Sequence, residues 1–168
     1  MFRSVVSAVL TVLLLSACAK DVPASKDAPA ADTQSTVTLN FQAIAGLNPG
    51  ASGQAAPVRV RIYELKNTAS FLRADYFALA DRAPATLGVD LIDQDEVLIQ
   101  PGELQSVVRH LDPATRHVGL VVGYREIDRA QWRALLDVPA RQTREYQISL
   151  DVQAVRTDVV ANPSRPAQ

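Results

Sequence analysis

A strict alternation of apolar and polar residues begins at residue 36 and returns several times along the chain. In residues 36–43, TVTLNFQA, every second side chain is apolar, and residues 58–63 and 145–154 repeat the pattern. A period of two is typical of a β-strand with one buried and one solvated face. Residues 117–124, HVGLVVGY, are almost entirely apolar or glycine, which indicates a central strand. Weaker strand candidates are residues 96–100 and 103–111.

Several short strands with turn residues between them favour a mainly β fold, which we expect to be a two-sheet antiparallel β-sandwich. Two segments with a helical period interrupt the strands. In residues 68–81 an apolar stripe is formed at i, i+4 and i+7 by Leu72, Tyr76 and Leu79. Phe71 and Phe77 lie off this stripe, which also allows two short helices in place of one.

A second short helix is predicted to begin at Asp128 and to end before Pro139. Asp128 can cap the first turn, with Gln131 three residues later in a variant of the capping box. Ile127 and Trp132 then take the positions of a hydrophobic staple. The buried stripe would consist of Trp132, Leu135 and Leu136. The expected domain is therefore a β-sandwich with a short inserted helical portion and a second short helix.

The first 17 residues, MFRSVVSAVLTVLLLSA, have the layout of a secretory signal peptide. Arg3 precedes an apolar stretch that is shorter than the ~20 residues needed to span a bilayer. The four residues at its end, Leu15-Ser16-Ala17-Cys18, resemble the lipobox of bacterial lipoproteins. That resemblance implies cleavage before Cys18, the only cysteine, which would carry a covalent diacylglycerol and an acylated amine. By the same resemblance, Ala19 in the next position favours sorting to the outer membrane.

The composition changes after the cysteine. Residues 20–35, KDVPASKDAPAADTQS, contain a single large apolar residue and cannot bury enough surface to offset the entropy of ordering. We therefore expect residues 1–17 to be a lipoprotein signal peptide and residues 18–35 to be the acylated cysteine with a flexible tether. Residues 36–159 would form the sandwich. Residues 160–168, which include two prolines, would form a disordered tail.

The connection between the first two predicted strands is unusually long. Residues 46–57 read GLNPGASGQAAP, whereas a hairpin needs about two to five residues. One interpretation is a slack surface loop. The other is a protruding binding loop, anchored by Leu47 and with a turn at Asn48-Pro49-Gly50 near its start.

Motifs for catalysis and for nucleic-acid binding are missing from the sequence. The net charge is −1 and there is no basic run, which argues against nucleic acid as a partner. There is no G-x-S-x-G elbow and no glycine-rich phosphate loop, and the single cysteine is assigned to the lipid. We therefore expect a protein that is not an enzyme and has no cofactor other than the covalent lipid.

Two groups of residues have some of the side chains that a metal site needs. His110 and His117 flank a turn with Asp112, but a metal site also needs a further ligand and an oriented second shell. A short acidic stretch, which contains Asp93, Asp95 and Glu96, lacks the spacing and glycine of a calcium loop. Surface histidines and a solvated acidic loop are the simpler interpretations, so we expect no metal.

Four features in a fixed order together resemble the TssJ-type (VasD/SciN-like) lipoproteins of bacterial type VI secretion systems. The first is the lipobox with its polar tether. The second is a strand, then LNPG with Gly53, then PVRVRIYEL at residues 57–65. The third is FLRADYFAL at residues 71–79, and the fourth is HVGLVVGYR at residues 117–125, followed by Ile127-Asp128 and Trp132-Arg133. The resemblance covers most of the chain after residue 36.

The resemblance implies a role in assembly. Members of this family look like a transthyretin-type β-sandwich with an added helical portion, anchored in the outer membrane and facing the periplasm. They bind the periplasmic C-terminal part of a large inner-membrane component, TssM, which also associates with TssL. The loop between the first two strands is the implied contact, and it maps here to residues 46–56. The implied partner-binding residues are Leu47, Asn48, Pro49, Gly50, Ala51, Ser52, Gly53 and Gln54.

Other functions remain open on the residues alone. A periplasmic ligand-binding or carrier lipoprotein could use the same sandwich, although the chain has only 4 Phe, 4 Tyr and 1 Trp from which to line a pocket. A metal-dependent enzyme would have to use His110 and His117. A third alternative is a lipoprotein chaperone or pilotin of another secretion machine. Only the order of the four motifs favours the TssJ-type family over this class.

Overall fold

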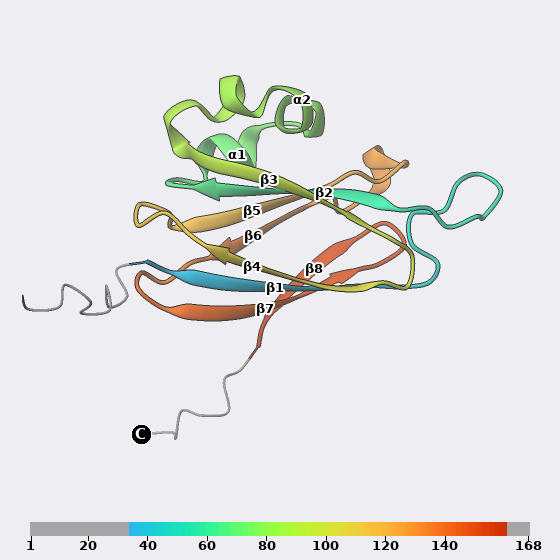
Figure 1. Ribbon diagram of the computed structural model, residues 1–168. Coiled ribbons are helices and arrows are strands. Elements are labelled where there is room, and N and C mark those ends of the chain that lie inside the picture. Colours follow the sequence, from blue (N-terminus) through green and yellow to red (C-terminus); the bar gives the residue numbers. More distant parts are fainter. Residues whose placement is uncertain (1–33, 161–168) are drawn as a thin grey trace, which may run out of the picture. The chain divides into compact units, whose positions relative to one another are not determined.

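The computed structural model describes residues 34–160, which fold into two packed four-stranded sheets (Figure 1). Sheet A contains, in spatial order, β4 (Leu104–His110), β1 (Thr36–Ala43), β7 (Thr143–Leu150) and β8 (Val155–Val159). Sheet B contains, in spatial order, β3 (Leu91–Ile99), β2 (Val58–Leu65), β5 (His117–Val122) and β6 (Arg133–Asp137). The prediction of a mainly β, two-sheet sandwich is confirmed.

The two sheets differ in strand direction. Sheet B is antiparallel at each of its strand pairs. In sheet A, β1 is antiparallel to β4 but parallel to β7, in register from Thr36 beside Thr143 to Ala43 beside Leu150. The expectation of a purely antiparallel sandwich was wrong at this pair. The alternation of apolar and polar residues predicts which face of a strand is buried. It does not predict which strand pairs with it or in which direction, because these depend on the path of the long connections.

Apolar side chains from the inner faces of both sheets form the main core. Strand β1 has the predicted bounds, and its apolar residues all point inward. Burial of each Val, Leu or Ile side chain contributes about 1.5–3 kcal/mol, so this layer dominates the stability of the sandwich. Its fully buried members from the central strands are Val37, Leu39, Phe41, Val58, Val60, Ile62, Val118, Leu120, Val122, Ile148 and Leu150.

A helical portion between β2 and β3 covers the outer face of sheet B (Figure 1). It consists of α1 (Ala69–Arg73), α2 (Tyr76–Leu87) and the single 3₁₀ turn η1 (Gly88–Asp90). Asp75 caps α2 by accepting a hydrogen bond from the Ala78 amide at 2.8 Å. The alternative of two short helices is therefore correct. The predicted stripe was wrong in part, because Leu72 is exposed whereas Phe71 is fully buried.

Because helices cover part of its outer face, sheet B is apolar on both sides at β5, at β6 and at the end of β2. The side chains of Val118, Leu120 and Val122 in β5 face the main core, whereas Val121 joins the cluster beneath the helices. Gly119 lies beneath Phe71, and a Cβ atom there would come within 2.7 Å of the Phe71 ring. This double coverage explains why residues 117–124 read as an almost continuous apolar run.

The predicted helix from Asp128 to Pro139 is absent. The chain forms a single 3₁₀ turn, η2 (Ile127–Arg129), followed by strand β6. In β6, Leu136 faces the main core, whereas Leu135 packs against the helical cluster. Adjacent apolar residues on a strand with two covered faces resemble a short helical stripe, and this caused the error.

Arg133 ties β6 to the helical portion. Its Nη1 atom donates hydrogen bonds to the carbonyl oxygens of Phe71, at 2.8 Å, and Ala74, at 3.0 Å. The guanidinium carbon lies 4.8 Å from the centre of the Trp132 ring. These bonds satisfy carbonyl groups where α1 ends, in the manner of a basic side chain at a helix C-terminus.

Two further elements differ from the sequence prediction. Strand β3 begins at Leu91, so the acidic residues Asp93, Asp95 and Glu96 lie on an edge strand and not in a loop. The strand expected over residues 145–154 ends at Leu150, and after a short turn the chain returns as β8.

Several predicted segments lie outside the described residues. These are the signal peptide at residues 1–17, Cys18 with the tether up to residue 33, and residues 161–168. Within residues 34–160, none of the helices has the length and apolar character needed to cross a bilayer.

Candidate functional site

The connection between β1 and β2 projects from one end of the sandwich (Figure 1). Leu47 is fully buried and anchors its base. The backbone of Leu47 donates a hydrogen bond to the Ile44 carbonyl at 3.2 Å and accepts one from Ala56 at 3.0 Å. The two ends of the loop are therefore joined to each other, and the base is part of the fold.

Asn48 fastens this loop to its neighbours. It is buried and has a positive φ of 49°, a conformation that Asn tolerates better than most residues. Its Nδ2 donates to the Pro57 carbonyl at 3.0 Å, and its Oδ1 accepts from the Arg125 amide at 2.8 Å. Its own amide donates to the Val152 carbonyl at 3.2 Å. One asparagine thus joins the β1–β2, β5–β6 and β7–β8 connections.

The tip of the loop is a hydrogen-bonded turn. The Gly50 amide donates to the Gln54 carbonyl at 3.0 Å, and the Gly53 amide donates to the Gly50 carbonyl at 2.8 Å. Gly53 has a φ of 77°, which glycine adopts without strain. The residues between these glycines are exposed. The tip is therefore presented to solvent in a defined shape.

The eight implied contact residues thus divide into two groups. Leu47 and Asn48 are buried and support the loop. Pro49 and Gly50 are half-buried. The exposed residues are Ala51, Ser52, Gly53 and Gln54. A partner can reach the last four without any change in the fold.

Arg125 is a neighbour of the tip that the sequence interpretation did not single out. It follows β5, is exposed, and lies with its guanidinium beside Gly50. The preceding residue, Tyr124, is buried, and burial raises the pKa of its hydroxyl. Nothing in the spacing of the sequence indicated that this connection meets the β1–β2 loop, because the contact joins residues 77 positions apart.

The entry of the chain into the fold is also fixed by hydrogen bonds. Ser35, which was expected to belong to the tether, is buried. Its hydroxyl donates to the Pro139 carbonyl at 3.1 Å and accepts from the Arg141 amide at 2.9 Å. Its carbonyl accepts from the Leu111 amide at 2.8 Å. The start of β1 is therefore held by two other connections, at the end of β1 opposite the β1–β2 loop.

The two histidines are not brought together. His110 is on sheet A, with Nδ1 3.1 Å from the Thr36 hydroxyl. His117 is on sheet B, with Nδ1 2.9 Å from the Asp137 carboxylate. In the part of the chain that the structure describes, no three His, Cys, Asp or Glu side chains are grouped for a metal ion. A metal-dependent enzyme using His110 and His117 therefore has no support in the structure.

The acidic residues of β3 bind arginine side chains. Arg109 of β4 reaches across the open side of the sandwich to Asp93 at 2.8 Å, Asp95 at 2.7 Å and the buried Glu64 at 3.0 Å. Glu64 also accepts from the Thr115 hydroxyl at 2.9 Å. Burial lowers the pKa of Arg109, but the Glu64 hydrogen bond and the charges of the three carboxylates outweigh it and raise that pKa overall. This network joins the two sheets.

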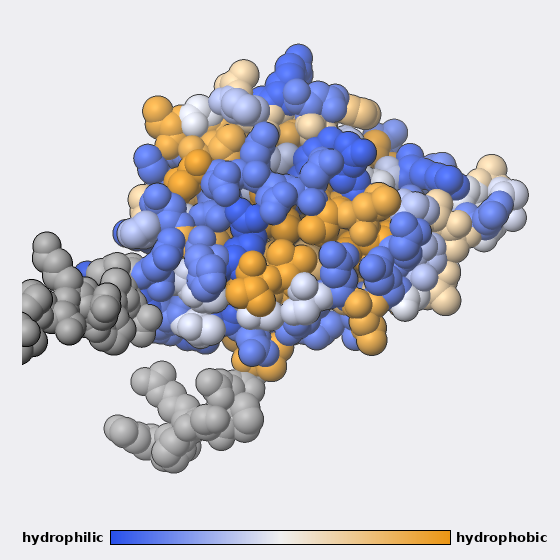
Figure 2. All heavy atoms as spheres, in the orientation of Figure 1, coloured by the Kyte–Doolittle hydropathy of each residue, from blue (hydrophilic) through white to orange (hydrophobic). Residues whose placement is uncertain are grey.

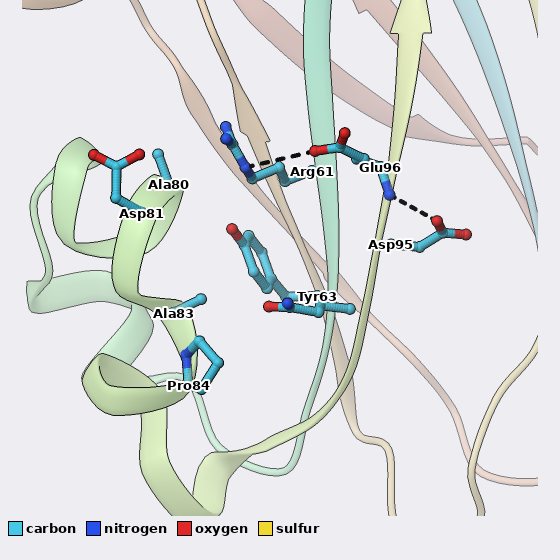
Figure 3. A pocket seen from close by; sticks show the side chains of 9 residues that line it. Arg61, Tyr63, Ala80, Asp81, Ala83, Pro84, Asp95 and Glu96 are labelled. Atoms are coloured by element: carbon cyan, nitrogen blue, oxygen red, sulfur yellow. Dashed lines mark hydrogen bonds and ion pairs between the residues drawn. The ribbon is translucent and has the colours of Figure 1, made fainter.

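A small cavity lies between α2 and sheet B (Figure 3). Its volume is about 300 Å³, and charged or polar side chains, among them Arg61, Asp81 and Glu96, form much of its lining. Tyr63 is its single aromatic residue, and the Tyr63 hydroxyl already donates to the Leu79 carbonyl at 2.8 Å. Ligand sites are usually lined by apolar and aromatic side chains. The cavity therefore does not favour the carrier function.

An apolar patch lies on the side of the sandwich where β3 and β4 run (Figure 2). The exposed large apolar residues of these two edge strands are Leu98, Leu104 and Val108. Patches of this kind often mark contact surfaces, so this one is a second candidate beside the loop.

Comparison with known proteins gives a consistent result. Residues 35–153 match the T6SS-SciN family, the type VI secretion lipoproteins that include VasD, EvfM and TssJ. The crystal structure of the T6SS lipoprotein TssJ1 from Pseudomonas aeruginosa superposes with a TM-score of 0.75. It is 48% identical over 77% of this chain and 99% of that one. A search of curated proteins found no significant match.

Two more distant structures agree. Serratia marcescens Lip, a membrane-bound component of the type VI secretion system, has a TM-score of 0.69 and 26% identity over 73% of this chain and 96% of its own. A chain in the structure of the T6SS protein TssM C-terminal domain (869–1107) from EAEC has a TM-score of 0.61 and 29% identity, covering 76% of this chain and 98% of that one. The family match over most of the folded domain, together with the 48% identity, shows that the chain belongs to the TssJ family of type VI secretion lipoproteins, structural components and not enzymes.

Proposed function

We propose that this lipoprotein is anchored in the outer membrane, faces the periplasm, and assembles the membrane core complex of its secretion system. Its partner is the periplasmic C-terminal domain of a large inner-membrane component of the TssM type. The observation that carries the proposal is the β1–β2 loop, whose tip is exposed and hydrogen-bonded into a defined turn. A loop that is already ordered binds at a lower entropic cost than one that orders on binding.

The EAEC structure supports this partner. The matched chain is covered to 98% by 76% of the 168 residues of this protein. It is therefore much shorter than the TssM segment 869–1107 after which that structure is described. A TssJ-like chain accompanying a TssM domain would account for the difference in length.

The direction of β1 suits a protein held at a membrane. The tether would enter at Ser35, and the loop leaves from the other end of a strand of 8 residues, ~26 Å away. A lipid on Cys18 would hold the entry end near the membrane and leave the loop free to face the opposite direction. Stable anchoring takes two or more acyl chains, which the proposed modification of Cys18 would supply.

Calorimetry tests the proposal. The chain from residue 19 onward, which contains the whole sandwich, is titrated with the C-terminal domain of the TssM-like protein from the same bacterium. We expect saturable binding that is lost when residues 50–54 are replaced by Gly-Ser repeats of equal length. The thermal unfolding of the replaced chain should match the parent, because Leu47 and Asn48 remain. Absence of binding by the parent chain, with the sandwich folded, would overturn the proposed function.

A further inference from the structure

We infer that Arg125 is part of the docking surface and pairs with a carboxylate of the partner protein. The inference deepens the proposed function and rests on it. It assigns a role to the β5–β6 connection and a chemistry to the partner, namely one Asp or Glu side chain that faces the tip of the β1–β2 loop.

Arg125 is fixed at its backbone, and its side chain lies against the start of the loop tip. The Arg125 amide donates to Asn48 Oδ1 at 2.8 Å, so the residue is joined to the base of the loop. At the other end of the side chain, Nη1 lies 2.5 Å and Cζ 3.6 Å from where a Cβ atom of Gly50 would be. The guanidinium therefore occupies the space that a side chain at position 50 would fill, at the start of the exposed tip.

The loop itself brings no charge to this surface. Residues 44–57, IAGLNPGASGQAAP, contain no ionisable side chain. Arg125 therefore supplies the cation that lies against the tip. An uncharged loop with one cation beside it favours a partner that places a single negative group opposite that cation.

Within residues 34–160, the guanidinium of Arg125 also has no charged partner. In the described part of the chain, Arg125 makes no ion pair, and its side-chain nitrogens donate no hydrogen bond. Several other arginines are paired with carboxylates, namely Arg59, Arg61, Arg109 and Arg156. Arg125 thus keeps all its side-chain donors for a partner, and a guanidinium matches a carboxylate in a bidentate geometry.

The charges around Arg125 narrow the kind of partner. Glu126 and Asp128 follow on the same connection and are exposed. They would repel a broadly acidic surface, so the partner group is best described as one carboxylate in a neutral or mixed setting. The ion pair between Arg125 and this carboxylate would be a charged contact beside the uncharged contacts of the loop.

Four variants of the full-length acylated protein, purified in detergent, test the inference against the same C-terminal domain. Arg125→Gln removes the charge, and Arg125→Glu reverses it. Gly50→Ala puts a methyl group where the guanidinium lies, at a glycine without a positive φ. Arg129→Gln is the matched control, an exposed arginine on the same connection that makes no ion pair within residues 34–160.

We expect Arg125→Gln to weaken binding about two- to tenfold at low salt and to flatten the salt dependence of the Kd, as for an exposed interfacial charge. Arg125→Glu should weaken it further, Gly50→Ala should resemble Arg125→Gln, and Arg129→Gln should bind as the parent does. If Arg125→Gln and Arg125→Glu bind as the parent does, the inference is wrong while the proposed function stands. If the parent itself does not bind, both fail. Thermal unfolding of each variant identifies any loss that comes from misfolding.

Discussion

Single residues decide how closely the layers of this protein approach. Gly119 lets the fully buried Phe71 ring lie directly on β5, and Gly123 does the same for the Tyr76 hydroxyl, which lies 2.9 Å from where a Cβ atom of Gly123 would be. Both glycines were visible in the sequence. Their role in packing could not be predicted, because it depends on contacts with the helical portion, which is distant in the sequence.

We predict that Gly119→Ala destabilises the protein. The new methyl group would lie 2.7 Å from the Phe71 ring and 3.2 Å from Leu65 Cδ1, and both side chains are fully buried and have little room to move. We expect a loss of about 1–2 kcal/mol in the free energy of unfolding, measured by urea titration. Gly46→Ala is the control, since nothing lies within 4 Å of its Cβ position. An equally stable Gly119→Ala variant would contradict the packing described for Phe71.

Tyr63 makes stability sensitive to alkaline pH. Burial raises the pKa of Tyr63 from 10.0 to about 12. Because the pKa is higher in the folded state, the contribution is fully present below pH 10 and is lost as the pH rises toward 12. We expect Tyr63 to account for a loss of about 2 kcal/mol over this range.

The matched variant for this titration is Tyr63→Phe. It should be less stable at neutral pH by about 1 kcal/mol, because the hydrogen bond to the Leu79 carbonyl is lost. It should also fall less steeply in stability above pH 10, when urea titrations are compared at several pH values. Equal slopes for parent and variant would show that Tyr63 does not carry the effect.

Elements were predictable where one face is buried and the other is solvated. Strand β1 was bounded correctly because its alternation has no break. Sheet B was harder where helices cover its outer face, since β5 and β6 are apolar on both sides there. There the apolar pair Leu135 and Leu136 was misread as a helical stripe, although it belongs to strand β6.

The candidate site, like the fold, was predictable from the sequence only in part. The length and glycine content of the β1–β2 loop marked it in the sequence as a binding loop or a slack surface loop. Its internal order could not be predicted, because Asn48 is held by groups of two other connections. Arg125 was missed for the same reason. Local patterns report burial and turn chemistry, whereas contacts between connections depend on the complete fold.

Asn48 provides the test of loop order. Asn48→Ala removes two side-chain hydrogen bonds and places alanine at a φ of 49°. We expect it to lower the free energy of unfolding by about 2–3 kcal/mol and to weaken partner binding. Asn48→Gly keeps the backbone conformation and should lose less stability. If Asn48→Ala unfolds and binds as the parent does, the loop does not depend on this residue.

At the scale of the whole molecule, the proposed anchor is tested by cell fractionation. We predict that the parent protein stays in the outer-membrane fraction at high salt, and that Cys18→Ser is found as a soluble periplasmic or an uncleaved form. Residues 34–160 are the same in both forms, so we expect their sandwiches to unfold alike. A Cys18→Ser protein that remains in the outer-membrane fraction at high salt would contradict lipid attachment at this cysteine.

Hydrogen exchange on the complex tests the central claim most directly, because the partner meets an unaltered protein. Exchange of the backbone amides is compared with and without the TssM-type C-terminal domain. We predict slower exchange in peptides that cover residues 49–55 and 123–126, at the loop end of the sandwich, and unchanged exchange in β4. Protection confined to the β3–β4 side, where Leu98, Leu104 and Val108 are exposed, with none in the loop, would contradict the account.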